Sequence, residues 1–538
     1  MITSNFIKRQ ITRFASVFYL ILLASTLYAQ NAAPAPKPAT TPKPAAAPAA
    51  KPAQPAPAAK PAVEKPLSFR FREIEKDSDE DRIRNQLSTI INKGQFENPD
   101  DKDALVRYYK DYFFGRWVNY GNFYKLETYP ETLKKQARSA KKPTDKKRLE
   151  AASTRWSYPF FIEDFRKDLD RSRSNGEPQK IAVKTAYDFA LEVIASNNVN
   201  CTPAVKYNCI LLLGNLYYKT TSASADLPVV YTPAFDLLIK IAAGTKSPRY
   251  MKIGAIMSLN QIIAETNLTD KQKSEVYSVL LEIVKTKIDP STFASSKDDP
   301  TGEGAFWTRD LAVEGLRLLA DFNAKVDKTQ GFYPGKEALA AIFQIINDKK
   351  APMPSRIAAM ESLGSYNFNK YPELKASASR LQRSVASLVV EAIQVELDRK
   401  VDNLIWGDEA EQLARNYGAD EAGTEPVDTT NNAIFLLQRA LPSVYAINTA
   451  LSGVKSDKGW KGLSDLGSAD DKARAAEMTG TLRDVNSSLN ALSKEIMPSN
   501  DSAHSADMES EDEETTDKLQ EVITVLNSIQ DAFRTFTE

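Results

Sequence analysis

The sequence predicts an all-α protein in which stacked helical hairpins are followed by a helical bundle with a heptad pattern. Three observations predict this fold class: a motif that recurs four times between residues 205 and 366, two heptad-spaced apolar series near the C-terminus, and only 21 glycines in 538 residues. Apolar residues at such spacings line one face of a helix. Few glycines leave few tight turns, which agrees with long helices.

The N-terminus has the pattern of a secretory signal peptide, which we place at residues 1–29. Three basic residues precede an apolar run from Phe14 to Leu27, and this run is shorter than the ~20 residues of a membrane-spanning helix. Cleavage near Gln30 would release the mature chain. We therefore expect an exported protein that is periplasmic, envelope-associated or extracellular, and that contacts the membrane only if this segment is retained.

Residues 30–66 are almost entirely Ala, Pro and Lys, and we expect them to form a disordered tether. This composition cannot form a packed core and favours the extended polyproline II conformation. A fully extended stretch from Asn31 to Pro66 would reach ~110 Å at ~3.1 Å per residue. The tether would therefore act as a spacer, although its five lysines could also approach an anionic surface.

The charge of the chain argues against a nucleic-acid partner. Its 70 basic and 70 acidic residues cancel, but three basic residues precede Gln30 and the tether carries a net +4, which leaves the remaining body near −7. A weakly acidic body with no basic stripe does not match the electrostatic footprint of a nucleic-acid-binding protein.

The region 67–178 is predicted to be helical and is rich in aromatic residues. Tyr109, Tyr112, Phe113 and Trp117 follow one another at helical spacing. Such a stripe is usually part of a core, and the alternative is an exposed aromatic platform that binds sugars or peptides.

The region 179–405 contains four related helices in which a basic residue is followed by a small residue and a leucine at offsets of three and four. These offsets place the small residue and the leucine on one helical stripe. The steps between successive basic positions are 46, 57 and 47 residues, a period typical of stacked helical hairpins. The four sets are Lys206, Cys209 and Leu213; Lys252, Ala255 and Leu259; Arg309, Ala312 and Leu316; and Arg356, Ala359 and Leu363.

Together with prolines before three of these helices, the pattern resembles HEAT-type repeats over about residues 188–367. The resemblance implies a HEAT-like right-handed α-solenoid that is used for protein contacts and has no catalytic residues of its own. The spacing of apolar residues predicts the intervening helices at Tyr231–Ala243, Lys271–Thr286 and Lys336–Asp348. We expect each basic residue either to reach a nearby acidic side chain or carbonyl group, or to remain a solvated charge.

The two cysteines, Cys201 and Cys209, leave two interpretations open. Export would favour a disulfide. If Thr202 caps a helix that begins at Pro203, however, Cys209 lies about 9 Å along that helix, beyond the ~7 Å over which Cα atoms are bridged. The alternative is a pair of thiols, with Cys209 in the core.

The C-terminal part is predicted as a linker (406–431) and a helical bundle or coiled coil (432–538) with an acidic disordered loop (498–517). Two heptad seams would form either an intramolecular three-helix bundle or a surface for self-association or a partner helix. Pro442 is expected to kink or interrupt the first of these helices. The first seam is Met478, Leu482, Val485, Leu489, Leu492 and Ile496, and the second is Leu519, Val522, Leu526, Ile529, Phe533 and Phe536.

The chain lacks the residues of common catalytic and metal sites. His504 is its only histidine, so a Ser-His-Asp or Cys-His arrangement and a His-ligated metal are excluded. No phosphate-binding or dinucleotide-binding motif occurs in the sequence. We therefore expect no cofactor, no metal and no catalytic residue.

Two functions remain for this sequence. The first is an exported, non-enzymatic scaffold that binds an envelope or secreted protein. The alternative is a carboxylate-based hydrolase or a binding protein for envelope glycans, which would use the aromatic region from Tyr108 to Tyr129.

The signal-peptide interpretation has a direct test. N-terminal sequencing of the exported protein should find a start near Gln30, because the apolar run is too short for a stable anchor. An intact Met1 end would instead identify a retained membrane anchor.

Overall fold

The computed structural model describes the chain from residue 67 onward, with gaps. The described residues are 67–69, 78–117, single positions between 135 and 146, 158–171, 176–218 without 199, 227–291 without 290, 302–326, 335–366, 368, 371–401, 429–453, 462–496 and 511–537. They form an all-α protein with one two-stranded sheet. The predicted signal peptide, the tether and His504 lie outside the described residues, as does most of the predicted linker.

The N-terminal part packs its helices around aromatic side chains. Residues 108–114 widen into a π-helix, η1, within an otherwise α-helical segment. It packs against α2, α3 and α8. The elements are α2 (Ser78–Lys93), α3 (Asp101–Arg107), η1 (Tyr108–Phe114), α4 (Gly115–Trp117) and α7 (Tyr158–Arg171).

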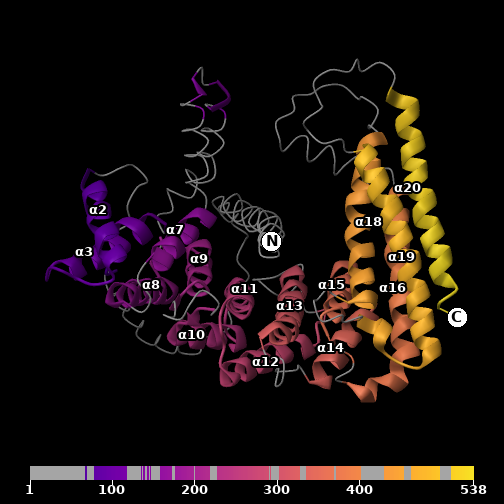
Figure 1. Cartoon of the computed structure of the whole chain (residues 1–538), viewed down its shortest axis with the longest axis horizontal. Coiled ribbons are helices and arrows are strands. Elements are labelled where there is room, and N and C mark those ends of the chain that lie inside the picture. The colour runs from indigo at the N-terminus through magenta and orange to yellow at the C-terminus, as the bar shows by residue number, and fades with distance from the viewer. Residues whose placement is uncertain are drawn as a thin grey trace, which may run out of the picture.

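Four helix pairs follow and form a curved row of two layers (Figure 1). We call α9, α11, α13 and α15 the inner layer, because they lie on the concave side of the row, and α8, α10, α12 and α14 the outer layer. Each inner helix packs on its outer partner and on the next inner helix. The pairs are α8 (Glu177–Ala195) with α9 (Pro203–Leu213), α10 (Thr232–Ala243) with α11 (Arg249–Glu265), α12 (Asp270–Lys285) with α13 (Glu303–Val326), and α14 (Lys336–Asn347) with α15 (Met353–Leu363).

Local sequence signals set where these helices begin. Thr202 caps α9 at Pro203, as predicted, and its side chain accepts a hydrogen bond from the Val205 amide. Thr269 and Gln272 form a reciprocal capping box at the start of α12. The short strands β1 (Tyr217–Tyr218) and β2 (Val229–Val230) pair antiparallel between α9 and α10.

The C-terminal part is a bundle of four helices that stand side by side (Figure 1). The sequence predicted three helices here, and the fourth is α16, which packs against α18 and α20. Helix α18 continues through Pro442 without interruption, and α20 begins at Glu511, inside the stretch predicted to be a disordered loop. The helices are α16 (Ala378–Val401), α18 (Thr429–Ser452), α19 (Ala469–Ile496) and α20 (Glu511–Arg534); short 3-10 turns η4 (Pro372–Ser377) and η5 (Gly462–Asp465) precede α16 and α19.

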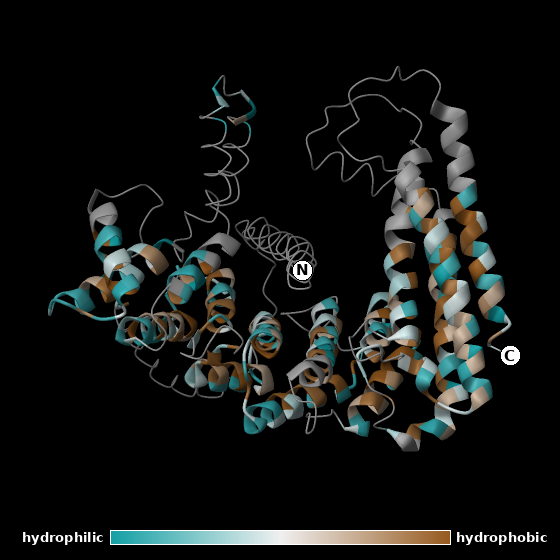
Figure 2. Ribbon diagram, viewed as in Figure 1, coloured by the Kyte–Doolittle hydropathy of each residue, from teal (hydrophilic) through white to brown (hydrophobic). Residues whose placement is uncertain are grey.

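Hydrophobic residues concentrate where the helices face one another, both in the row and inside the bundle (Figure 2). One continuous core runs from the aromatic N-terminal part to the bundle. Within the described ranges, no helix is both long and apolar enough to cross a membrane.

The row and the bundle meet where α15 packs on α18. Gly364, at the end of α15, allows this close approach: a Cβ atom there would lie 2.3 Å from the carbonyl oxygen of Thr449. A side chain at this position would therefore push two helices apart.

The substitution Gly364→Ala should lower the free energy of unfolding by about 1–3 kcal/mol, because a methyl group would overlap a backbone atom. The matched control is Gly480→Ala in α19, where nothing lies within 4 Å of the added methyl group. The free energy of unfolding of that variant should rise by about 0.5–1 kcal/mol, because alanine has a higher helix propensity than glycine. Urea denaturation followed by circular dichroism measures both, and a Gly364→Ala variant as stable as the wild type would contradict the close contact.

Candidate interaction surface

The small residues and leucines of the four related helices lie in the core. Each has at most 1% of its surface exposed. They sit on the four inner helices, within the main core. These residues are Cys209, Leu213, Ala255, Leu259, Ala312, Leu316, Ala359 and Leu363.

The four basic residues differ in how they are satisfied. Lys206 and Lys252 are half-buried, and burial lowers the pKa of Lys252. Arg356 is buried, donates from Nε to the Ile346 carbonyl at 2.8 Å, and pairs from Nη1 with Glu391 of α16 at 2.5 Å. Arg356 therefore links α14, α15 and α16.

Arg309 occupies the equivalent place on α13 without an equivalent set of partners. It is 5% exposed, and neither Nε nor Nη2 has a hydrogen-bond partner. Its guanidinium lies 5.3 Å from the centre of the Phe306 ring. Burial lowers the pKa of Arg309, and the nearby Asp310 and Asp348 oppose that shift.

Cys201 and Cys209 are both buried and are not joined by a disulfide. Burial raises the pKa of the Cys209 thiol well above its usual value, and Cys201 adds to the shift. A protonated, buried thiol is chemically inert and behaves as a small apolar side chain.

Three of the four residues of the predicted aromatic stripe are packed in a core, and the side chain of Trp117 lies outside the described residues. Tyr109 is fully buried, its ring meets Phe165 edge-on at 5.4 Å, and its hydroxyl donates to Asp168 at 3.1 Å. Burial raises the pKa of Tyr109, and the carboxylate of Asp168 adds to the shift. Tyr112, Phe113 and Phe114 are buried beside it. None of these four rings offers an exposed face for a sugar or peptide to stack on.

The described residues of the two heptad seams lie inside the bundle. Met478, Leu482 and Leu489 of α19 are fully buried, and Val485 and Leu492 pack on the same core. On α20, Val522, Leu526, Ile529 and Phe533 are fully buried, and Phe536 packs beside them. The side chains of Ile496 and Leu519 lie outside the described residues. Most of the described seam residues therefore hold the bundle together, whereas Val485 and Phe536 are partly exposed.

A second apolar cluster lies on the inner layer, and two of its members, Ile162 and Leu311, also pack against the main core. We call it the inner-face patch: buried Tyr207, Leu211 and Ile253, with the partly exposed Ile162, Tyr250, Met257, Trp307 and Leu311 packed against them. Its members come from α7, α9, α11 and α13. The Tyr207 hydroxyl lies 3.2 Å from the sulfur of Met257.

Helical geometry explains why the inner-face patch is separate. On α11, Ile253 and the core residue Ala255 are two positions apart, which places them about 200° apart around the helix. The same helices therefore carry one apolar stripe toward the outer layer and another away from it. Sequence reasoning missed the second stripe, although Tyr207, Tyr250 and Trp307 stand within two residues of the basic positions.

A polar border runs along the C-terminal ends of the inner helices. Gln261 of α11 donates to Asn215 at 2.9 Å, and Arg166 of α7 pairs with Glu265 at 2.9 Å. On α13, Arg317 pairs with Glu314 and donates to Ser365, which follows the end of α15. An apolar centre with a hydrogen-bonded polar rim is the usual anatomy of a protein-binding surface.

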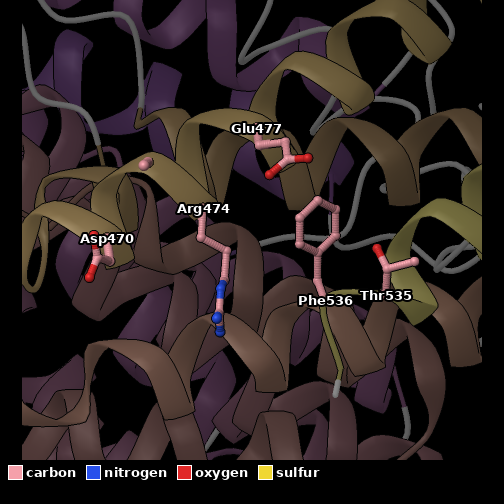
Figure 3. A pocket seen from close by; sticks show the side chains of 6 residues that line it. Asp470, Arg474, Glu477, Thr535 and Phe536 are labelled. Atoms are coloured by element: carbon pink, nitrogen blue, oxygen red, sulfur yellow. The ribbon is translucent and has the colours of Figure 1, made fainter.

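A shallow hollow of about 450 Å³ lies at the end of the bundle (Figure 3). Asp470, Arg474 and Glu477 of α19 line one side, and Thr535 and Phe536 follow the end of α20 on the other. Its charged groups are of both signs and lie on one helix, so they do not single out a ligand.

Among the described residues, no group of histidine, cysteine, aspartate or glutamate side chains is arranged to hold a metal ion. Comparison of the chain with models of protein families, with curated proteins and with solved structures finds no match. A proposed function therefore has to rest on the physical features of the surface.

Arg356 and Arg309 make a matched pair for testing the basic position. Arg356→Met should lower the free energy of unfolding by about 1–3 kcal/mol, because it leaves the Ile346 carbonyl and Glu391 without their buried partner. Arg309→Met should change it by less than about 1 kcal/mol, because the lost side chain has few polar partners and methionine is a good helix former.

Chemical denaturation of both variants under the same conditions measures the difference. An equal loss of stability in the two variants would show that the guanidinium groups of Arg309 and Arg356 are equally well supplied with polar partners.

Proposed function

We propose that this protein is an exported, non-enzymatic helical-repeat scaffold that binds another protein through the inner-face patch. The observation that carries the proposal is a partly exposed aromatic and aliphatic cluster that spans α7, α9, α11 and α13 outside the main core. Tyrosine and tryptophan are the residue types that dominate binding energy when a partner buries them. The patch holds the partly exposed Tyr250 and Trp307 on the neighbouring helices α11 and α13, beside the buried Tyr207 of α9.

We further propose that the four helix pairs form a short HEAT-like right-handed α-solenoid. Two features support this interpretation: each inner helix packs on the next inner helix, and α10, α12 and α14 do the same in the outer layer. In such an arrangement each pair contacts only its neighbours and the concave side is an extended binding surface.

The inner-face patch replaces the heptad seams as the proposed binding surface. A seam whose leucines are fully buried in its own bundle would have to open before it could bind a partner helix, and that opening costs the burial of each leucine. The partner we propose is a protein of the envelope or of the extracellular space, in line with the signal-peptide pattern.

Crosslinking and affinity capture with the full-length chain tests this function. Wild-type protein should retain a reproducible partner, and Trp307→Ser or Tyr250→Ser should lose it by tenfold or more, because truncating a central aromatic anchor typically costs about 2 kcal/mol or more. The matched control is Tyr445→Ser, which removes an exposed ring, 45% exposed, from α18 in the bundle.

Circular dichroism establishes that each variant is folded. The proposal would be contradicted if the patch variants retained the partner as well as Tyr445→Ser does. It would also be contradicted if Tyr445→Ser lost the partner to the same degree as the patch variants.

A further inference from the structure

We propose that two copies of this protein associate through the outer layer of the row, with their α8 helices antiparallel about a two-fold axis. This inference goes beyond the proposed function and does not rest on it, because it concerns a different surface from the inner-face patch. We call this surface the outer-face patch: Tyr187 and Leu191 of α8, Tyr218 of β1, Val229 of β2, and Tyr231, which precedes α10.

The outer-face patch is continuous. Leu191 follows Tyr187 by four residues on α8, so the two side chains are neighbours on the helix surface. The ring of Tyr231 meets that of Tyr187 edge-on at 5.4 Å and that of Tyr218 edge-on at 5.6 Å. Tyr218 and Val229 stand opposite each other in the β1–β2 pair, so their side chains lie on the same face. The five side chains therefore follow one another in an unbroken line across the surface.

This patch is exposed to a degree that its composition does not favour. In the described part of the chain three large apolar side chains are exposed, and two of them, Leu191 at 40% and Val229 at 41%, belong to the patch. The three tyrosines are partly exposed. Contiguous apolar surface of this kind marks an interaction site. Because leucine and valine gain most from burial against other apolar side chains, the patch suits a protein surface.

The charges on α8 indicate that the partner is a second copy of this chain. Ionic residues recur every four positions, with Lys180 and Lys184 in the N-terminal half and Asp188 and Glu192 in the C-terminal half. Lys184 and Asp188 pair at 2.5 Å, and their side chains are still 64% and 43% exposed. A two-fold axis turns the second α8 antiparallel, so the lysine half of each helix faces the acidic half of the other. This order of charges is complementary to itself.

The geometry of α8 fits such a dimer. An axis that passes midway between Lys184 and Asp188 places Lys184 of each copy against Asp188 of the other. Tyr187 then lies within about 2 Å of that midpoint along the helix, at a rise of ~1.5 Å per residue, so the aromatic rings of both copies meet near the centre. The 19 residues of α8 extend over about 28 Å. The pair of helices with the patch beside it has room for the ~800 Å² per subunit that a stable interface buries.

The dimer has a consequence for partner binding. Helices α8 and α10 lie on the convex side of the row, whereas the inner-face patch belongs mainly to helices of the concave side (Figure 1). Two copies joined through the outer layer would therefore carry two inner-face patches that both stay accessible. A bivalent scaffold binds a repetitive partner about 10²–10⁴ times more tightly than one copy does. This consequence alone depends on the proposed function.

Sedimentation equilibrium of the full-length chain tests the dimer. Wild-type protein should show a monomer–dimer equilibrium, and Leu191→Ser should raise its Kd tenfold or more, because the two-fold axis removes the same anchor from both copies. Val229→Ser, which leaves α8 unchanged, should act in the same direction. The matched control Tyr445→Ser removes an exposed ring from the bundle and should not change the Kd. Circular dichroism establishes that each variant is folded.

A charge exchange tests the antiparallel arrangement. Lys184→Glu alone and Asp188→Lys alone should each raise the Kd roughly tenfold, because both charge pairs across the axis become repulsive. An equimolar mixture of the two variants should recover the dimer, since each introduced charge then faces an opposite charge on the other chain. The pair within one helix cannot explain this recovery, because it is broken in both variants.

Three results would overturn the inference. A wild-type chain that stays monomeric over the whole concentration range would exclude the dimer. A dimer that neither Leu191→Ser nor Val229→Ser weakens would use another surface of the chain. A mixture of Lys184→Glu and Asp188→Lys that dimerises no better than either variant would exclude the antiparallel pairing of α8. None of these results bears on partner capture through the inner-face patch, which is measured with different variants.

Discussion

The structure depends on one constraint: the inner helices α9 and α11 are buried around most of their circumference and must be covered on two sides. In α9, every residue from Tyr207 to Leu213 is buried. A helix of this kind is stable only inside a larger assembly. The outer layer covers one side, and the neighbouring inner helices and α7 cover part of the other. A single helix pair could not cover both sides of its inner helix. The row therefore has to be built from several pairs and closed at both ends.

The two ends of the row are closed by different means. At the N-terminal end, rings from η1, α7 and α8 pack against one another, and Phe114 stacks on Phe189 at 5.1 Å. At the other end α15 packs on α18, so a four-helix bundle takes the place of a further pair. Gly364 permits that contact at backbone distance. Stacked repeats generally need such caps because their end pairs would otherwise expose an apolar face.

The sequence predicts the helices well because helix formation is set locally. Apolar spacing located α10, α12 and α14 to within one residue, and Thr202 with Pro203 located the start of α9. What a helix packs against is not local. Helix α16 has the same apolar period whether it continues the row or joins the bundle, and the sequence analysis included it in the repeat region 179–405. Likewise, heptad spacing predicts an apolar seam without stating whether the chain's own helices or a partner cover it.

The candidate surface could not be found from the sequence for a related reason. A helix that is apolar all round gives no sign of which stripe faces the outer layer and which remains partly exposed. The difference between Arg309 and Arg356 arises in the same way, since Glu391 lies on α16, outside the repeating motif. Under the proposed function, the residues that differ between the helix pairs would carry specificity, because the shared small residues and leucines are buried in the core. In the inner-face patch these are the aromatic residues beside the basic positions, which vary from helix to helix while the small residue and leucine behind them persist.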